Sequence, residues 1–245
     1  MNEENGRRVA LVTGAARRLG RSISIELARC RFDVWVHYRD SEDEAAEVVA
    51  ECRERGVEAR AVQADLRRKA DIDRMIMQID EQRGRLDLLV NNASSFYPTP
   101  FGDVSEAQFD ELVGSNFKGP FFCSQRAAPM LAATKGQIIH LLDTSWPRPW
   151  KGYLPYCASK AALRSLTAGM AIELAPRVRV NAVAPGPVLP PEDYDEVQRQ
   201  QALESTLLRR SGSPEAVAET VAFLATGPDW ITGAVVPVDG GRSLT

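Results

Sequence analysis

Short β-branched runs alternate with longer stretches of helical period along this 245-residue chain, and this alternation most constrains its fold. The runs predict strands at 9–12, 33–38, 57–64, 86–90, 136–142, 177–185 and 235–239. The stretches between them predict helices at 19–30, 42–55, 71–83, 105–133 and 155–175. Strands that alternate with helices imply parallel βαβ units. We therefore predict an α/β fold: a doubly wound parallel sheet of the Rossmann type with helices on both faces.

No linker rich in Gly, Ser or Pro divides the chain, so we expect a single domain over residues 1–245. The segment 187–210 departs from the regular pattern. It begins among four prolines in seven residues and continues as a charged, weakly amphipathic helix. In an open α/β sheet, a long segment after the carboxyl end of a strand lies where ligands bind. This segment is therefore either a solvated surface excursion or a lid on the substrate side.

Composition narrows the class of protein. The formal net charge of −3 argues against nucleic-acid binding, and no apolar run approaches the roughly 20 residues of a membrane helix. The acidic start of the chain does not resemble a signal peptide. The cysteines are scattered, without the spacing of metal ligands, at Cys30, Cys52, Cys123 and Cys157. We expect a cytoplasmic protein that binds a small molecule and no metal.

The stretch TGAARRLG (13–20) joins the first predicted strand to the first predicted helix. Gly14 permits a tight turn, and Gly20 permits close packing where the helix begins. Free N–H groups at a helix N-terminus bind a pyrophosphate, and the guanidinium groups of Arg17 and Arg18 strengthen such an anion site. The spacing differs from the G-x-G-x-x-G fingerprint. We predict a dinucleotide site at this turn.

The stretch HYRDS (37–41), at the end of the second strand, indicates which dinucleotide binds. Proteins that prefer NAD usually carry an acid there, to bind the ribose hydroxyls. Tyr38 occupies that place, and Arg39, with His37 and Ser41 nearby, could hold a 2′-phosphate. Asp40 weakens the inference because its carboxylate could fold back. The sequence favours NADPH over NADH.

Tyr156 and Lys160 stand four residues apart on one face of a predicted helix. A free tyrosine titrates near 10, too high for acid–base chemistry at neutral pH. An ammonium about 4 Å away, at an effective dielectric constant near 20, favours the phenolate by roughly 4 kcal/mol. We therefore expect the pKa of Tyr156 to fall to about 7.

With these motifs, the chain resembles the short-chain dehydrogenase/reductase family over essentially its full length. The matching motifs fall in the family's order: TG-x5-G, Asp65-Leu66, NNA at 91–93, Asn116, YxxxK, Pro185-Gly186 and Ile231-Thr232-Gly233. The resemblance implies that Asp65 lies near adenine, that Asn116 holds a water in a proton relay and that Lys160 also binds the nicotinamide ribose. The cofactor set is Gly14, Arg17, Arg18, Leu19, Gly20, His37, Tyr38, Arg39, Ser41, Asp65, Leu66, Asn92, Ala93, Ser94, Tyr156, Lys160, Pro185 and Gly186.

Three departures from the family pattern indicate a subfamily. Asp143 replaces the usual catalytic serine, Arg18 replaces a glycine, and Ser94 follows the NNA motif. With NNASSFYPTP (91–100), these changes resemble pteridine reductases. This resemblance implies that Phe96 stacks on a pterin and that Ser94 and Arg18 bind its polar edge. The substrate set is Arg18, Ser94, Phe96, Asp143, Tyr153 and Tyr156.

The predicted function is the NADPH-dependent reduction of a dihydropterin to its tetrahydro form, and the family resemblance implies a homotetramer. Its catalytic residues are Tyr156, Lys160, Asp143 and Asn116. The C-terminal half also resembles bacterial dihydromonapterin reductases, so dihydrobiopterin, dihydromonapterin and dihydrofolate all stay open as substrates. One alternative is a 3-oxoacyl carrier-protein reductase or another carbonyl reductase, although a carboxylate would repel the developing alkoxide. Another is a non-catalytic NADPH-binding sensor.

Overall fold

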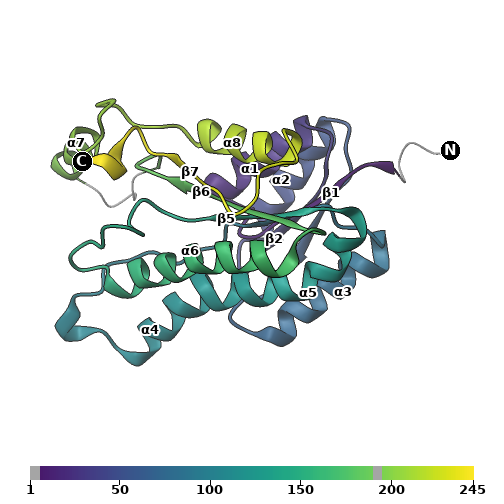
Figure 1. Cartoon of the computed structure of the whole chain (residues 1–245), viewed down its shortest axis with the longest axis horizontal. Coiled ribbons are helices and arrows are strands. Elements are labelled where there is room, and N and C mark those ends of the chain that lie inside the picture. Colours follow the sequence, from purple (N-terminus) through teal and green to yellow (C-terminus); the bar gives the residue numbers. More distant parts are fainter. Residues whose placement is uncertain (1–5, 190–194) are drawn as a thin grey trace.

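A computed structural model of the chain describes residues 6–189 and 195–245 (Figure 1). The strands are β1 (Val9–Val12), β2 (Asp33–Tyr38), β3 (Ala59–Gln63), β4 (Leu88–Asn91), β5 (Gln137–Leu141), β6 (Arg179–Pro185) and β7 (Val235–Val238). The helices are α1 (Arg18–Arg29), α2 (Glu42–Glu54), α3 (Lys69–Arg83), α4 (Glu106–Val113), α5 (Gly119–Thr134), α6 (Leu154–Leu174), α7 (Glu196–Glu204) and α8 (Pro214–Thr226).

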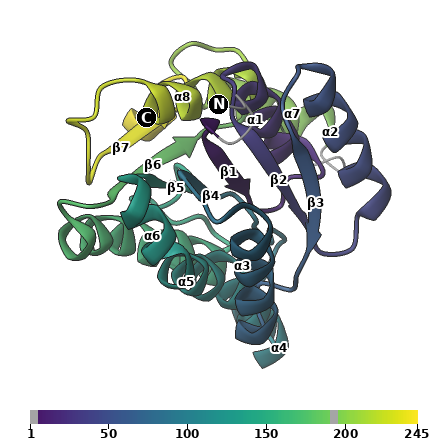
Figure 2. The same ribbon diagram turned by 90° about the vertical axis from the view of Figure 1, so that its right-hand side faces the viewer.

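All the strands join one parallel sheet in the order β3-β2-β1-β4-β5-β6-β7 (Figure 2). The order reverses between β1 and β4, because the chain crosses from one edge of the sheet back to its middle. Ligands of open α/β sheets bind beside the carboxyl ends of the strands at such a switch point. The topology therefore places the TGAARRLG turn beside the NNASSFYPTP loop.

Helices cover both faces of the sheet, as predicted (Figure 1). Helices α1, α2 and α8 pack on one face, and α3, α5 and α6 pack on the other. The strands β1, β2, β4 and β5 are buried along their whole length, which explains their nearly continuous apolar runs. The predicted single-domain, doubly wound α/β fold is confirmed.

Three segments differ from the prediction. The helix expected at 105–133 is divided by a π turn, η3 (Gly114–Lys118), into α4 and α5. The sequence analysis predicted no element between 211 and 234, yet α8 lies there, and the Ser213 hydroxyl caps it by accepting a hydrogen bond from the Ala216 amide at 3.2 Å. In the segment 187–210, which was expected to continue as a weakly amphipathic helix, the helix is α7. Residues 190–194 of this segment lie outside the described residues. Within the described residues, none of the helices combines the length and apolar character that a membrane crossing requires.

Both histidines are buried in the sheet and are neutral there. His37 accepts a hydrogen bond from the Gly14 amide at Nδ1 (2.9 Å), and its Nε2 lies 3.0 Å from the Ala64 carbonyl oxygen. Burial lowers the pKa of His37 to about 4. Burial, and to a lesser extent the Lys160 ammonium, lowers the pKa of His140 to about 3.

Acidification from pH 7 to about 5 is expected to lower the free energy of unfolding by about 4 kcal/mol. In the unfolded chain both rings regain a pKa near 6.5, so between that value and their folded values the unfolded state binds more protons. Stability therefore falls as the pH falls, by about 2 kcal/mol for each ring at pH 5. Urea denaturation at the two pH values measures the change. A His140→Gln variant should lose half of the pH dependence, and equal stabilities of the wild type at the two pH values would contradict the interpretation.

Candidate active site

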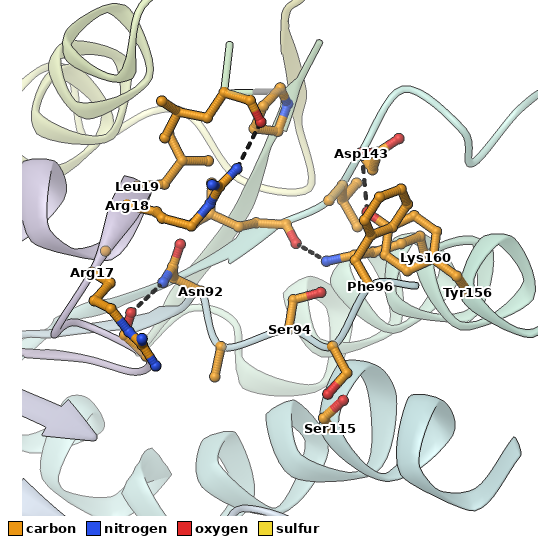
Figure 3. Close-up of a pocket in the computed structure, with 18 of the residues that line it drawn as sticks. Arg17, Arg18, Leu19, Asn92, Ser94, Phe96, Ser115, Asp143, Tyr156 and Lys160 are labelled. Carbon is orange, nitrogen blue, oxygen red and sulfur yellow. Dashed lines mark hydrogen bonds between the residues drawn. The ribbon is translucent and has the colours of Figure 1, made fainter. Parts of the chain in front are cut away.

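A cavity of about 820 Å³ opens at the carboxyl ends of the strands. It extends from the turn after β1 to the start of α6, and Figure 3 shows the residues at its two ends. The residues predicted to bind cofactor or substrate all line it: Gly14, Arg17, Arg18, Leu19, Gly20, His37, Tyr38, Arg39, Ser41, Asp65, Leu66, Asn92, Ala93, Ser94, Phe96, Asp143, Tyr153, Tyr156, Lys160, Pro185 and Gly186.

The turn after β1 is locked to the end of β4. The Thr13 hydroxyl oxygen accepts hydrogen bonds from the backbone amides of Asn92 (2.9 Å) and Ala93 (3.1 Å). The Asn92 side chain donates in return to the carbonyls of Thr13 and Gly14. Gly14 has a φ of 61°, and a Cβ there would lie 2.8 Å from the Cα of Ala93. The NNA motif therefore holds the backbone that borders the cavity.

The N-terminus of α1 is open to an anion. No side chain of the described residues caps it, and its first turn contains no acid, so its N–H groups and their positive dipole face the cavity. Arg17 and Arg18 flank it. Arg18 has a φ of 53°, in the left-handed region that favours glycine, and its guanidinium donates to the Leu189 carbonyl oxygen at 2.7 Å. Backbone strain of this kind clusters at binding and catalytic sites.

Two arginine–aspartate pairs also line the cavity. Arg67 binds both carboxylate oxygens of Asp65, and these hydrogen bonds lower the pKa of Asp65 to about 2. The Arg39 guanidinium donates to the Asp40 carboxylate at 2.5 Å, so Asp40 does fold back on it. Arg67 also lines the cavity and was missed in the sequence, because it belongs to no motif.

His37 lines the cavity, but its predicted role as a phosphate ligand is not supported. Both of its ring nitrogens are occupied by the Gly14 amide and the Ala64 carbonyl. With a pKa of about 4, the ring carries no charge at neutral pH. His37 therefore supports the turn after β1 rather than attracting an anion.

Asp143 and Tyr156 form the polar centre at the other end of the cavity (Figure 3). The Tyr156 hydroxyl donates to Oδ2 of Asp143 at 3.0 Å, and Oδ1 accepts from the Ser145 amide at 2.7 Å. Lys160 donates to the Leu141 carbonyl oxygen at 2.9 Å, and its Nζ lies 5.7 Å from the centre of the Tyr156 ring. A proton donor, a carboxylate and an ammonium thus lie together.

The expected fall in the Tyr156 pKa is wrong for this arrangement. Burial raises the pKa of Tyr156 well above its ordinary value, and the adjacent Asp143 carboxylate raises it further. Lys160 is turned toward Leu141 instead of the phenol oxygen, and burial lowers its own pKa to about 8. The i,i+4 estimate failed because it counted the ammonium and left out both the burial of the phenol and the Asp143 carboxylate.

The Tyr156 ring belongs to a cluster of four aromatic rings, with those of Phe96, Tyr153 and Trp150. The rings of Phe96 and Tyr153 stack with centroids 4.9 Å apart and an interplanar angle of 8°. Phe96 meets Tyr156 edge-on at 4.8 Å, and Trp150 lies 6.4 Å from both Phe96 and Tyr156. Phe96 remains 37% exposed, so part of its ring is available to a ligand. Trp150 was not predicted, because its loop carries no recognised motif.

Two asparagines lie behind the cavity and do not line it. Asn116 is fully buried and exchanges two hydrogen bonds with the backbone of Ser95, so its side chain holds the loop after β4. These contacts do not support its predicted place in a water relay. Asn91 contacts Ser124 and His140 inside the sheet.

Comparison with known proteins agrees with this site. Residues 14–243 match the family model described as enoyl-(acyl carrier protein) reductase. A 3-oxoacyl-[acyl-carrier-protein] reductase of Staphylococcus epidermidis is 38% identical over 240 residues, which covers 96% of this chain and 98% of that protein. Pteridine reductase 1 of Leishmania tarentolae is 36% identical over 279 residues, which covers 97% of this chain and 96% of that protein.

Solved structures agree in fold. A short-chain dehydrogenase/reductase of Serratia marcescens superimposes with a TM-score of 0.91 at 35% identity, covering 96% of this chain and 98% of its own. An angucycline C-6 ketoreductase with bound NADP also superimposes with a TM-score of 0.91. It is 33% identical, and the superposition covers 97% of this chain and 96% of that protein. The motif order, the fold and these relatives agree, and the chain is an oxidoreductase of the short-chain dehydrogenase/reductase family.

Proposed function

We propose that this chain is an NADPH-dependent reductase of dihydropterins. The observation that carries the proposal is the Asp143 carboxylate, 3.0 Å from the Tyr156 hydroxyl. A carboxylate only accepts hydrogen bonds, so it suits a substrate that presents N–H donors beside the reacting atoms. A pterin has such donors, next to ring nitrogens that take up a proton. The carbonyl oxygen of a 3-oxoacyl thioester has none.

The aromatic cluster supports the same class of substrate. A planar heterocycle gains most from a flat aromatic face with polar groups at its edge. Phe96 offers such a face, with Ser94 and Arg18 lining the same cavity. Tyr153 now stacks on Phe96, so a bound ring either uses the exposed part of Phe96 or displaces Tyr153.

The residues that line the cavity would hold NADPH, which when bound supplies the hydride. The uncapped N-terminus of α1, with Arg17 and Arg18, would bind the pyrophosphate. Arg39 would release the carboxylate of Asp40 and bind a 2′-phosphate in its place.

Proton delivery would come from Tyr156. Its raised pKa keeps the proton on Oη at neutral pH, and Asp143 fixes the direction of the hydroxyl. When Oη gives its proton to a ring nitrogen, a phenolate is left next to a carboxylate. Lys160, which is mostly charged at pH 7 with a pKa of about 8, would offset that charge.

A 3-oxoacyl thioester reductase is the second candidate, and the comparisons favour it at least as strongly. The Staphylococcus relatives are described as 3-oxoacyl-[acyl-carrier-protein] reductases, and the family model is described as enoyl-(acyl carrier protein) reductase. Thr144, next to Asp143, also lines the cavity and could offer a hydroxyl donor to an oxyanion. The carboxylate of Asp143 opposes this reaction, because negative charge develops beside it.

NADPH oxidation by the purified protein separates the candidates. Dihydrobiopterin, dihydromonapterin, dihydrofolate and an acetoacetyl thioester are compared in parallel, each also with NADH. We expect kcat/KM to be at least about tenfold higher for a pterin than for the thioester, and higher with NADPH. Thioester turnover without pterin turnover would establish the second candidate. Tight NADPH binding without any turnover would indicate a sensor.

Two expectations stay predictions. A lid at 187–210 would have to border the cavity, and four residues of this segment line it: Pro187, Val188, Leu189 and Gln201. That the segment closes over a bound substrate stays a prediction. The homotetramer is likewise untested, and size-exclusion chromatography with light scattering would measure it.

A further inference from the structure

The cavity continues past the aromatic cluster to an arginine near the C-terminus. Arg242 opens the short helix η4 (Arg242–Leu244), which follows β7, and it lines the cavity together with Trp150. Its guanidinium carbon lies 5.3 Å from the centre of the Trp150 ring. Nη1 donates to the hydroxyl of Ser205, just after α7, at 2.7 Å. These contacts hold the side chain at the substrate end.

The charge of Arg242 is not neutralised within the described residues. No carboxylate there lies within 4.0 Å of its guanidinium nitrogens. Asp239 is close in sequence, but its two oxygens accept from the amides of Gly241 (2.9 Å) and Ser243 (2.8 Å). A guanidinium has five N–H donors, and the bond to Ser205 uses one. Arg242 therefore keeps both charge and donors for a ligand.

A second donor lies near Arg242. It is the side chain of Gln201, which also lines the cavity. The Ser205 amide donates to the Gln201 carbonyl oxygen at 3.0 Å, so Gln201 and Ser205 stand one helical turn apart. Ser205 is the residue that holds the guanidinium. A guanidinium and a carboxamide therefore border the same end of the cavity, a combination that suits a carboxylate.

We infer that Arg242 selects pterins whose side chain ends in a carboxylate. The inference rests on the proposed function and names the substrate class within it. A ring that lies on the exposed part of Phe96 has Trp150 beside it, because the Trp150 ring is 6.4 Å from those of both Phe96 and Tyr156, and Arg242 lies on Trp150. A substituent with an aromatic or amide spacer could pass along Trp150 and place its carboxylate at the guanidinium. 7,8-Dihydrofolate has this form, whereas 7,8-dihydrobiopterin is uncharged.

Steady-state kinetics of an Arg242→Gln variant with both pterins test the inference. We expect kcat/KM for dihydrofolate to fall at least about tenfold more than kcat/KM for dihydrobiopterin, through KM rather than kcat. Added salt should weaken dihydrofolate turnover selectively in the wild type. Arg242→Lys, which keeps the charge, should recover part of the loss. Arg148→Gln is the matched control, because Arg148 is exposed, contacts the C-terminal residue Thr245 and does not line the cavity.

The outcomes separate the two proposals. Wild-type protein that reduces neither pterin overturns the proposed function, and the inference with it. Wild-type protein that reduces both pterins, with an Arg242→Gln variant that loses the same factor for each, overturns the inference alone and assigns Arg242 a structural role. Equal losses in the Arg148→Gln control would also overturn it, because the effect would then come from the C-terminal segment as a whole.

Discussion

Replacement of Tyr156 by phenylalanine is expected to lower kcat for a dihydropterin by about 10²–10⁴-fold. The change removes only the hydroxyl that donates to Asp143, and it keeps the ring that packs against Phe96 and Trp150. Cofactor affinity should stay close to that of the wild type. Single-turnover oxidation of NADPH measures the chemical step, and protein fluorescence measures the binding.

Tyr153→Phe is the matched control for this prediction. Tyr153 stacks on Phe96 in the same cluster and also carries a phenol, but its ring is not the one bonded to Asp143. We expect its kcat to fall by less than about tenfold. A Tyr156→Phe variant that keeps the wild-type kcat would show that another group delivers the proton.

The fold could be predicted because its signals are local. The strands β1, β2, β4 and β5 are buried on both faces and carry continuous apolar runs, and seven predicted strands that alternate with helical stretches admit few topologies. Helix α8 could have been found as well, because Ser213 and Pro214 form a usual helix start. The π turn at Gly114–Lys118 could not, since no local pattern distinguishes it from a continuous helix.

The parts of the site that could be predicted are those whose residues belong to recognised motifs. The glycine turn, the NNA motif and the Tyr156–Lys160 pair all border one cavity, as the sequence suggested. Trp150 and Arg242 were missed because their places depend on how the loop before α6 and the C-terminal segment meet. The Tyr156 pKa was misjudged for a related reason: it depends on burial and on Asp143, thirteen residues away in sequence.

Replacement of Asp143 by serine is expected to lower pterin reduction and to raise thioester reduction. The variant loses the carboxylate that would accept from a pterin N–H, so kcat/KM for the pterin should fall by about 10²-fold or more. It gains a hydroxyl donor 13 residues before Tyr156, where the family usually has its serine, so thioester turnover should rise at least about tenfold. Because the carboxylate raises the pKa of Tyr156, its loss should also move the pH dependence of kcat to lower pH.

Asp143→Asn separates charge from hydrogen bonding in the same experiment. The amide has the size of the carboxylate and one accepting oxygen, but it carries no charge. If the charge repels a developing alkoxide, this variant should also gain thioester turnover while it keeps part of its pterin turnover. Pterin rates that survive unchanged in both variants would show that Asp143 does not contact the substrate. The distinction between a pterin reductase and a carbonyl reductase would then depend on the aromatic cluster alone.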